Sequence, residues 1–156
     1  MLLGNVKDKP KTCVPVFLEC VKDDDPSVRA QAIDNLMAMR PEAAEVMSAL
    51  SKAIKDKDSD DNVRTLAIRM AGSYGAKAKP VVPALLELLD KPKPDLWFVE
   101  LLDTLAAIGP GAKEALPKLR KLREEKAIAD VSNSFGGRNV NFGHLIAQTI
   151  QKIEGE

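Results

Sequence analysis

The stretch from Asp60 to Asp90, DDNVRTLAIRMAGSYGAKAKPVVPALLELLD, decides the fold of this chain. In its first half, apolar residues recur three and four positions apart, from Val63 to Tyr74. A short GAKAK linker follows, and the same spacing returns from Val82 to Leu89. This periodicity predicts two short amphipathic helices joined by a tight turn. Because two such helices cannot bury their apolar stripes on each other completely, the unit needs neighbours of its own kind.

The unit recurs along the chain. Val28, Val63 and Trp97 hold equivalent core places in successive first helices, at steps of 35 residues (28 to 63) and 34 residues (63 to 97). A fourth copy begins at Phe142, 45 residues after Trp97, because an insertion precedes it. Self-similarity at a nearly fixed period of this size is typical of an all-α solenoid, here of about four helical hairpins.

Two segments carry a family resemblance. Asp25–Arg29, DPSVR, and Asp60–Arg64, DDNVR, are each followed by alanine three residues later, and they resemble short HEAT-like repeats of the bacterial and archaeal type. Ala107–Leu119, AIGPGAKEALPKL, is similar to the turn and second helix of that type. The resemblance implies a right-handed α-α superhelix, a HEAT-like solenoid, with a ladder of Asp and Arg hydrogen bonds along the repeats.

The third and fourth copies depart from that pattern. Phe98 and Gly143 stand where the first two repeats have Arg29 and Arg64, so the ladder is not expected to continue past the second repeat. Because Phe98 replaces a partly exposed arginine, it is also a candidate interaction residue, since aromatic side chains are enriched in interface hot spots.

We expect residues 1–156 to form one HEAT-like repeat domain. Residues 1–6 read like the tail of a first helix, and the helix predicted over residues 11–22 is apolar around much of its circumference. A terminal repeat normally has a polar outer face. The chain is therefore a piece of a longer solenoid, or it self-associates through the N-terminal helix near Phe17, or residues 1–6 fold back as a cap.

Composition excludes several classes of function. The 23 basic residues equal the 23 acidic ones, so no overall field favours nucleic acid. No apolar run approaches the roughly 20 residues that span a bilayer, and the start lacks a secretory signal, so the expected location is the cytoplasm. With a single histidine, and without a nucleophile elbow, a phosphate-binding loop or zinc spacing, we expect no catalytic residue, cofactor or metal site and no enzyme activity.

The second helices supply the candidate binding surface, because the resemblance implies that they line the concave face. One aligned position reads Glu19, Lys52, Glu87, Lys121. This row predicts either ion pairs between repeats or a mixed-charge groove for a protein or peptide partner. A basic cluster lies toward the later repeats, made of Lys77, Lys79, Lys113, Lys118, Arg120, Lys121 and Arg123.

The insertion from Glu124 to Asn141 is predicted to be a loop, because Asn133, Ser134, Gly136 and Gly137 are loop residues. Two readings of it stay open. Its Phe135 and Arg138 could join the binding surface, or Phe135 and Phe142 could pin the loop over Trp97 and Phe98.

The expected function is a non-catalytic protein-binding scaffold or adaptor that uses the concave face of the solenoid. Two alternatives follow from the resemblance. The chain could act like the phycobilisome-lyase-type HEAT-like proteins, on a bilin or as an accessory to a partner's modification. It could also bind nucleic acid, as HEAT-like DNA glycosylases do.

Overall fold

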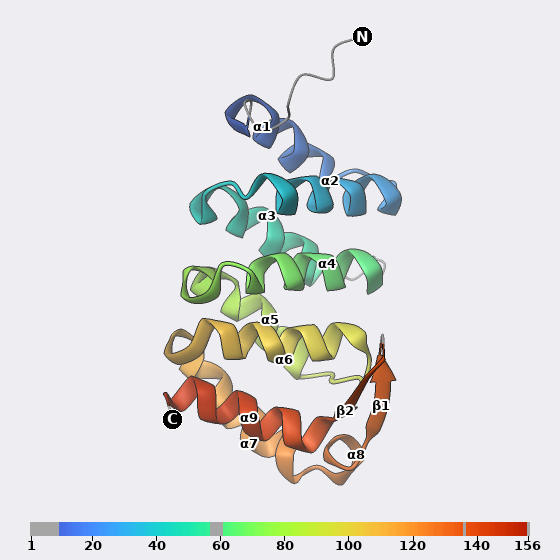
Figure 1. Cartoon of the computed structure of the whole chain (residues 1–156), viewed down its shortest axis with the longest axis vertical. Helices are drawn as coiled ribbons and strands as arrows, with labels where there is room; N and C mark the ends of the chain where they lie inside the picture. Colours follow the sequence, from blue (N-terminus) through green and yellow to red (C-terminus); the bar gives the residue numbers. More distant parts are fainter. Residues whose placement is uncertain (1–9, 57–60, 136, 156) are drawn as a thin grey trace.

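The computed structural model describes residues 10–56, 61–135 and 137–155, and it is a stack of helical hairpins (Figure 1). The predicted helix tail at residues 1–6 lies outside these residues. First helices stack directly on one another, and they are α2 (Pro26–Met39), α4 (Asp61–Gly72), α6 (Leu96–Ile108) and α9 (Phe142–Glu154). Second helices form the other row, and they are α1 (Pro10–Cys20), α3 (Ala43–Lys55), α5 (Val82–Leu89) and α7 (Leu116–Glu124). The 3₁₀ segments η2 (Gly75–Val81) and η3 (Gly109–Ala115) lead into α5 and α7.

The predicted apolar stripes form the core of this stack, with one exception. Val63, Trp97 and Phe142 are buried at equivalent places in α4, α6 and α9. Val28, at the same place in α2, is 37% exposed, so its predicted burial was wrong. The cause is its place in the stack: α2 is the outermost first helix among the described residues, and α1 is the only described helix on that side of it.

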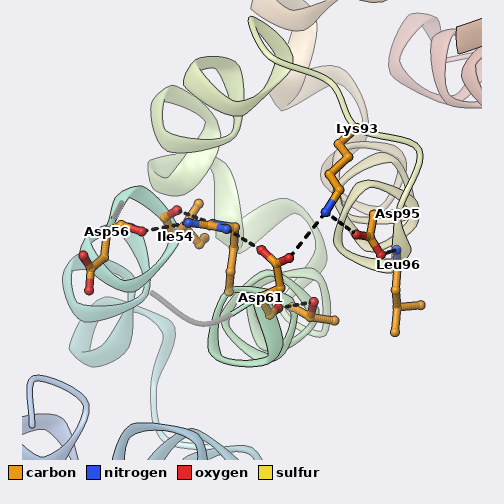
Figure 2. Close-up of polar contacts among 8 residues, drawn as sticks. Ile54, Asp56, Asp61, Lys93, Asp95 and Leu96 are labelled. Carbon is orange, nitrogen blue, oxygen red and sulfur yellow. Dashed lines mark hydrogen bonds and ion pairs between the residues drawn. The ribbon is translucent and has the colours of Figure 1, made fainter. Parts of the chain in front are cut away.

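The ladder implied by the arginines is present in both repeats that contain them. The Arg64 guanidinium donates from Nη2 to the Asp56 carbonyl at 2.8 Å and from Nη1 to Asp61 Oδ1 at 2.8 Å. It thereby ties the end of α3 to the start of α4, and Figure 2 labels the two residues that accept these bonds, Asp56 and Asp61. Arg29 does the same one repeat earlier, donating to the carbonyls of Asp23 and Asp24.

Lys93, which is not part of the Asp/Arg pattern, makes a polar contact between the second and third repeats. Figure 2 shows Lys93 between Asp61 and Asp95, with its Nζ 3.0 Å from Asp95 Oδ2 and 3.7 Å from Asp61 Oδ2. The hydrogen bond from Lys93, and that from the Leu96 amide, lower the pKa of Asp95. The same hydrogen bond to Asp95, with the charges of Asp95 and Asp61, raises the pKa of Lys93. The Asp/Arg ladder was predicted not to continue past the second repeat, and the third repeat has the buried Phe98 where an arginine would stand. Lys93 instead supplies a Lys–Asp contact between the second and third repeats.

The predicted exposure of Phe98 was also wrong. Phe98 is fully buried, where an exposed interaction residue was predicted. Its ring stacks on Phe142 at a centroid distance of 5.6 Å and meets Trp97 edge-on at 5.8 Å. Because α9 packs against α6, the position that an arginine would hold at a repeat's edge here faces an apolar neighbour.

Much of the described insertion is regular secondary structure. Helix over Lys126–Ala129 agrees with the interpretation that Glu124–Ala129 could continue the preceding helix, whereas the loop predicted around Asn133 and Ser134 was wrong. After α7 come the short α8 (Lys126–Ala129) and an antiparallel hairpin of β1 (Ser132–Phe135) and β2 (Arg138–Asn141). Gly137 at its tip has φ 80°, a conformation that glycine adopts without strain. Phe135 meets Phe142 edge-on at 6.3 Å, and the Asn133 amide donates to the Pro94 carbonyl at 3.1 Å. The predicted pinning of this segment by Phe135 and Phe142 is thus confirmed.

Candidate functional site

The four residues of the predicted row lie on four successive second helices. Glu19, Lys52, Glu87 and Lys121 are all exposed, on α1, α3, α5 and α7 respectively. We call the exposed side of these helices, together with η2 and η3, the second-helix face. Its regular spacing follows from the repeat, since α3 packs against α5 and α5 against α7.

The four residues of the row do not form ion pairs with one another. The ion pairs between second helices involve residues about one helical turn from the row. Glu87 bonds Lys55 of α3 at 2.5 Å instead of Lys52. Asp90 bonds Lys118 of α7 at 2.5 Å, and Lys118 also donates to the Leu86 carbonyl at 3.0 Å. In each case the partner sits three residues from the predicted one, which is about one helical turn. The predicted ladder of ion pairs was therefore wrong in its partners.

The two ends of the row use partners on their own helix or just beyond it. Glu19 accepts from Lys22 at 2.7 Å, and Lys121 lies 4.0 Å from Glu125. Lys52 has no ion pair within the described residues. An exposed pair contributes only about 0–1 kcal/mol, so these side chains remain available to a binding partner.

Three hollows follow one another across the second-helix face. The first, of about 480 Å³, lies between the α1–α2 turn and α3. The second, of about 650 Å³, lies between α3 and η2, and the third, of about 300 Å³, lies between η2, α5 and η3. Lys52 lines both the first and the second, and Pro80 lines both the second and the third. Because each hollow shares one lining residue with the next, the three lie in a row across the second-helix face, and we call this row the groove.

Of the predicted surface residues, Lys52 lines this groove, whereas Glu19, Glu87 and Lys121 are not among its lining residues. Phe98 is buried in the core, and Phe135 is half-buried against Phe142. The backbone of Arg138 pairs with that of Phe135 at the end of the hairpin, and its side chain lies outside what the structure describes. Neither Phe98 nor Phe135 lines any of the three hollows.

The basic cluster is partly neutralised. Lys118 pairs with Asp90, Arg120 with Glu154, and Lys121 with Glu125. Lys77 and Lys79 instead line the second and third hollows. The cluster thus includes paired residues of α7 and two lysines of the groove, while Lys113 and Arg123 belong to neither group.

Sequence reasoning missed several residues of the groove. Lys55 was one turn from a predicted residue and could have been found from its spacing. Met47 and Pro80 carried no signal of this kind, because a hollow depends on how closely two segments approach. Lys77 was noted only as a member of the basic cluster, and its place in the hollow was not predicted.

Metal sites and membrane-spanning helices are two further features to consider in the described residues. Across the described ranges, no group of three or more His, Cys, Asp or Glu side chains is placed to hold a metal ion. The described helices include none with the length and apolar character needed to cross a bilayer.

Comparison with known proteins gave one match. A family model described as HEAT repeats matches residues 14–103, which is more than half of the chain. Neither the curated proteins nor the solved structures gave a match.

Proposed function

We propose that this chain, which belongs to the HEAT repeat family, is a non-catalytic scaffold that binds a protein or peptide through its second-helix face. The observation that carries the proposal is the groove, whose three hollows share walls at Lys52 and Pro80. Ligand sites are concave and mostly apolar with a few polar groups. The second and third hollows have that character, whereas charged residues make up much of the first.

The distribution of polar contacts supports the same face. The first-helix side of the stack is occupied by contacts between repeats, such as the bond of Arg69 to Glu100 at 2.9 Å. On the second-helix face, Lys52 and Lys77 have no ion pair among the described residues and both line the groove. A partner can therefore contact Lys52 and Lys77 without displacing an ion pair. Lys55 also lines the groove, and its pair with Glu87 links α3 to α5.

The nucleic-acid alternative has less support. Three of the cations in its basic cluster are paired with carboxylates of the chain. Affinity for nucleic acid rests mostly on phosphate neutralisation, and the chain has no net charge to supply it. For the bilin-related alternative, nothing in the described part of the chain speaks in its favour.

A charge-swap capture experiment tests the proposal. Wild type, Glu87→Lys/Lys121→Glu on the second-helix face, and Asp34→Lys/Lys152→Glu on first helices α2 and α9 are each used to capture partners from a lysate of the source cells. All four positions are exposed, and each double variant keeps the net charge. We expect one specific partner to be lost with the first variant and kept with the second. Recovery that is equal for all three proteins, or lost only with the control, counts against this face.

A further inference from the structure

The middle hollow of the groove, between α3 and η2, differs from its neighbours in charge. Among the described residues, three lysines line it and no carboxylate does, whereas acidic residues line both flanking hollows. Its lining residues are Ala44, Met47, Ser48, Ser51, Lys52, Lys55, Lys77 and Pro80. We call this the lysine hollow.

The lysines stand on both sides of the hollow. Lys52 and Lys55 come from successive turns of α3, and Lys77 comes from η2 across it. Only Lys55 has a carboxylate beside it, Glu87 of α5 at 2.5 Å. Lys52 and Lys77 have no ion pair among the described residues, so the hollow presents unneutralised positive charge from two directions.

The floor between the lysines is apolar. Met47 is 4% exposed and reaches the hollow from the core side of α3, while Ala44 and Pro80 add apolar surface. Ser48 and Ser51 place hydroxyl groups along the same helix. With a volume of about 650 Å³, the hollow has room for several side chains of a ligand.

We propose that the lysine hollow binds an acidic peptide segment, with an apolar side chain on the Met47 floor and flanking carboxylates on Lys52, Lys55 and Lys77. This assignment rests on the proposed function and adds the chemistry of the partner. The apolar floor favours a peptide over a nucleic-acid backbone, whose recurring phosphates offer no apolar group at that depth. Opposite charges across the contact also speed association and disfavour basic partners.

A randomised peptide library displayed on phage is the probe. It is selected against the wild-type chain, and the best synthetic peptide is then titrated against two matched variants. Lys52→Gln/Lys55→Gln/Lys77→Gln removes the charges of the hollow. Lys91→Gln/Lys126→Gln/Lys152→Gln removes the same charge from exposed lysines elsewhere. Circular dichroism and a urea titration establish that both triple variants fold.

We expect the selected peptides to be rich in Asp and Glu around an aliphatic or aromatic residue. Binding should weaken about threefold for each lysine of the hollow that is replaced, and about 30-fold for all three together, because exposed ion pairs are individually weak. The control triple variant should stay within about twofold of wild type. Ala44→Glu, in the exposed first turn of α3 where an acidic residue suits the helix, should also weaken binding by about tenfold.

Four results would overturn this inference. Selected peptides that are neutral or basic, but compete for the second-helix face, would overturn it and leave the proposed function standing. Equal weakening by the two triple variants would make the effect a general one of charge. Tighter binding of a thymidine oligonucleotide, with the same lysine dependence, would assign the hollow to nucleic acid. A selection that enriches no peptide would refute the acidic peptide as the ligand of the hollow. The capture experiment tests the proposed function separately.

Discussion

The hydroxyl of Thr104 lies where a side chain at Gly72 would have to be. A Cβ built on Gly72 would stand 2.6 Å from Thr104 Oγ1, and Thr104 donates at 3.0 Å to the Ile68 carbonyl of the neighbouring first helix. Glycine at the end of α4 therefore lets α4 and α6 approach closely enough for this hydrogen bond between layers.

Gly72→Ala should destabilise the fold by about 1–3 kcal/mol, because Thr104 is buried and β-branched and cannot swing aside. Thr104→Ala should relieve the clash, so in that background Gly72→Ala should be neutral or stabilising, as alanine is the better helix former. Urea unfolding of the four proteins of this cycle measures the coupling. Additive effects of the two substitutions would contradict the close contact.

Tyr74 links one repeat to the one before it. Its hydroxyl donates to the Pro41 carbonyl at 2.7 Å, and burial, the largest cause, raises the pKa of its hydroxyl. Tyr74→Phe should cost about 1 kcal/mol of unfolding free energy. Because the raised pKa favours the protonated form, this stabilisation is complete below the unfolded pKa near 10 and is lost as pH rises through the folded value. The chain has one tyrosine, so phenolate absorbance follows the titration directly, and a midpoint at or below the ordinary value would contradict the contact.

Asp95 caps α6 and holds Lys93. Asp95→Ala should cost about 1 kcal/mol at neutral pH, as expected for loss of a helix cap. The lowered pKa of Asp95 means that its contribution is present above the ordinary value of 3.8 and is lost as pH falls through the folded value. Chemical denaturation of wild type and variant across acidic pH should show the difference shrinking as the carboxylate is protonated. A difference that persisted unchanged in acid would assign the effect to packing instead.

Gly143 marks a close approach between α9 and the insertion. A Cβ at this position would lie 2.7 Å from the Ala129 carbonyl oxygen, a backbone atom that cannot rotate away. Gly143→Ala should displace α8 and the hairpin, and amide hydrogen exchange over residues 126–135 and 137–141 should quicken while exchange in α2 and α4 stays unchanged. Exchange that quickened equally in every layer would indicate general destabilisation.

The surface near Phe17 keeps its predicted role in self-association as a proposal. Val16 is 60% exposed and Val28 is 37% exposed at this end of the described stack. We expect wild type to show a concentration-dependent sedimentation coefficient and Val16→Lys/Val28→Lys to abolish that dependence. Gln148→Lys/Gln151→Lys on α9, which adds the same charge at exposed positions, should behave as wild type. A wild type that is monomeric at all concentrations would refute self-association.

The sequence predicted the stack well because helix formation and stacking both depend on local apolar spacing, which is regular from Val63 to Leu89. It misplaced Phe98 because the alignment compared positions along one helix, whereas burial there is decided by α9 and Phe142. It misplaced Val28 because a core residue needs a neighbouring layer as well as the right spacing. Glu87 pairs with Lys55, one turn from the predicted Lys52, since axial offsets between helices are not encoded in the repeat.

The hairpin has a mechanical consequence. Through Asn133 on the Pro94 carbonyl and Phe135 on Phe142, it fastens the α6 layer to the α9 layer outside their helix contact. Among the described residues, no other pair of layers is joined by such a hairpin. Under tension applied along the long axis, as in an optical-tweezers experiment, the layers from α1 to α5 should separate at lower force than the α6 and α9 layers, which the hairpin joins.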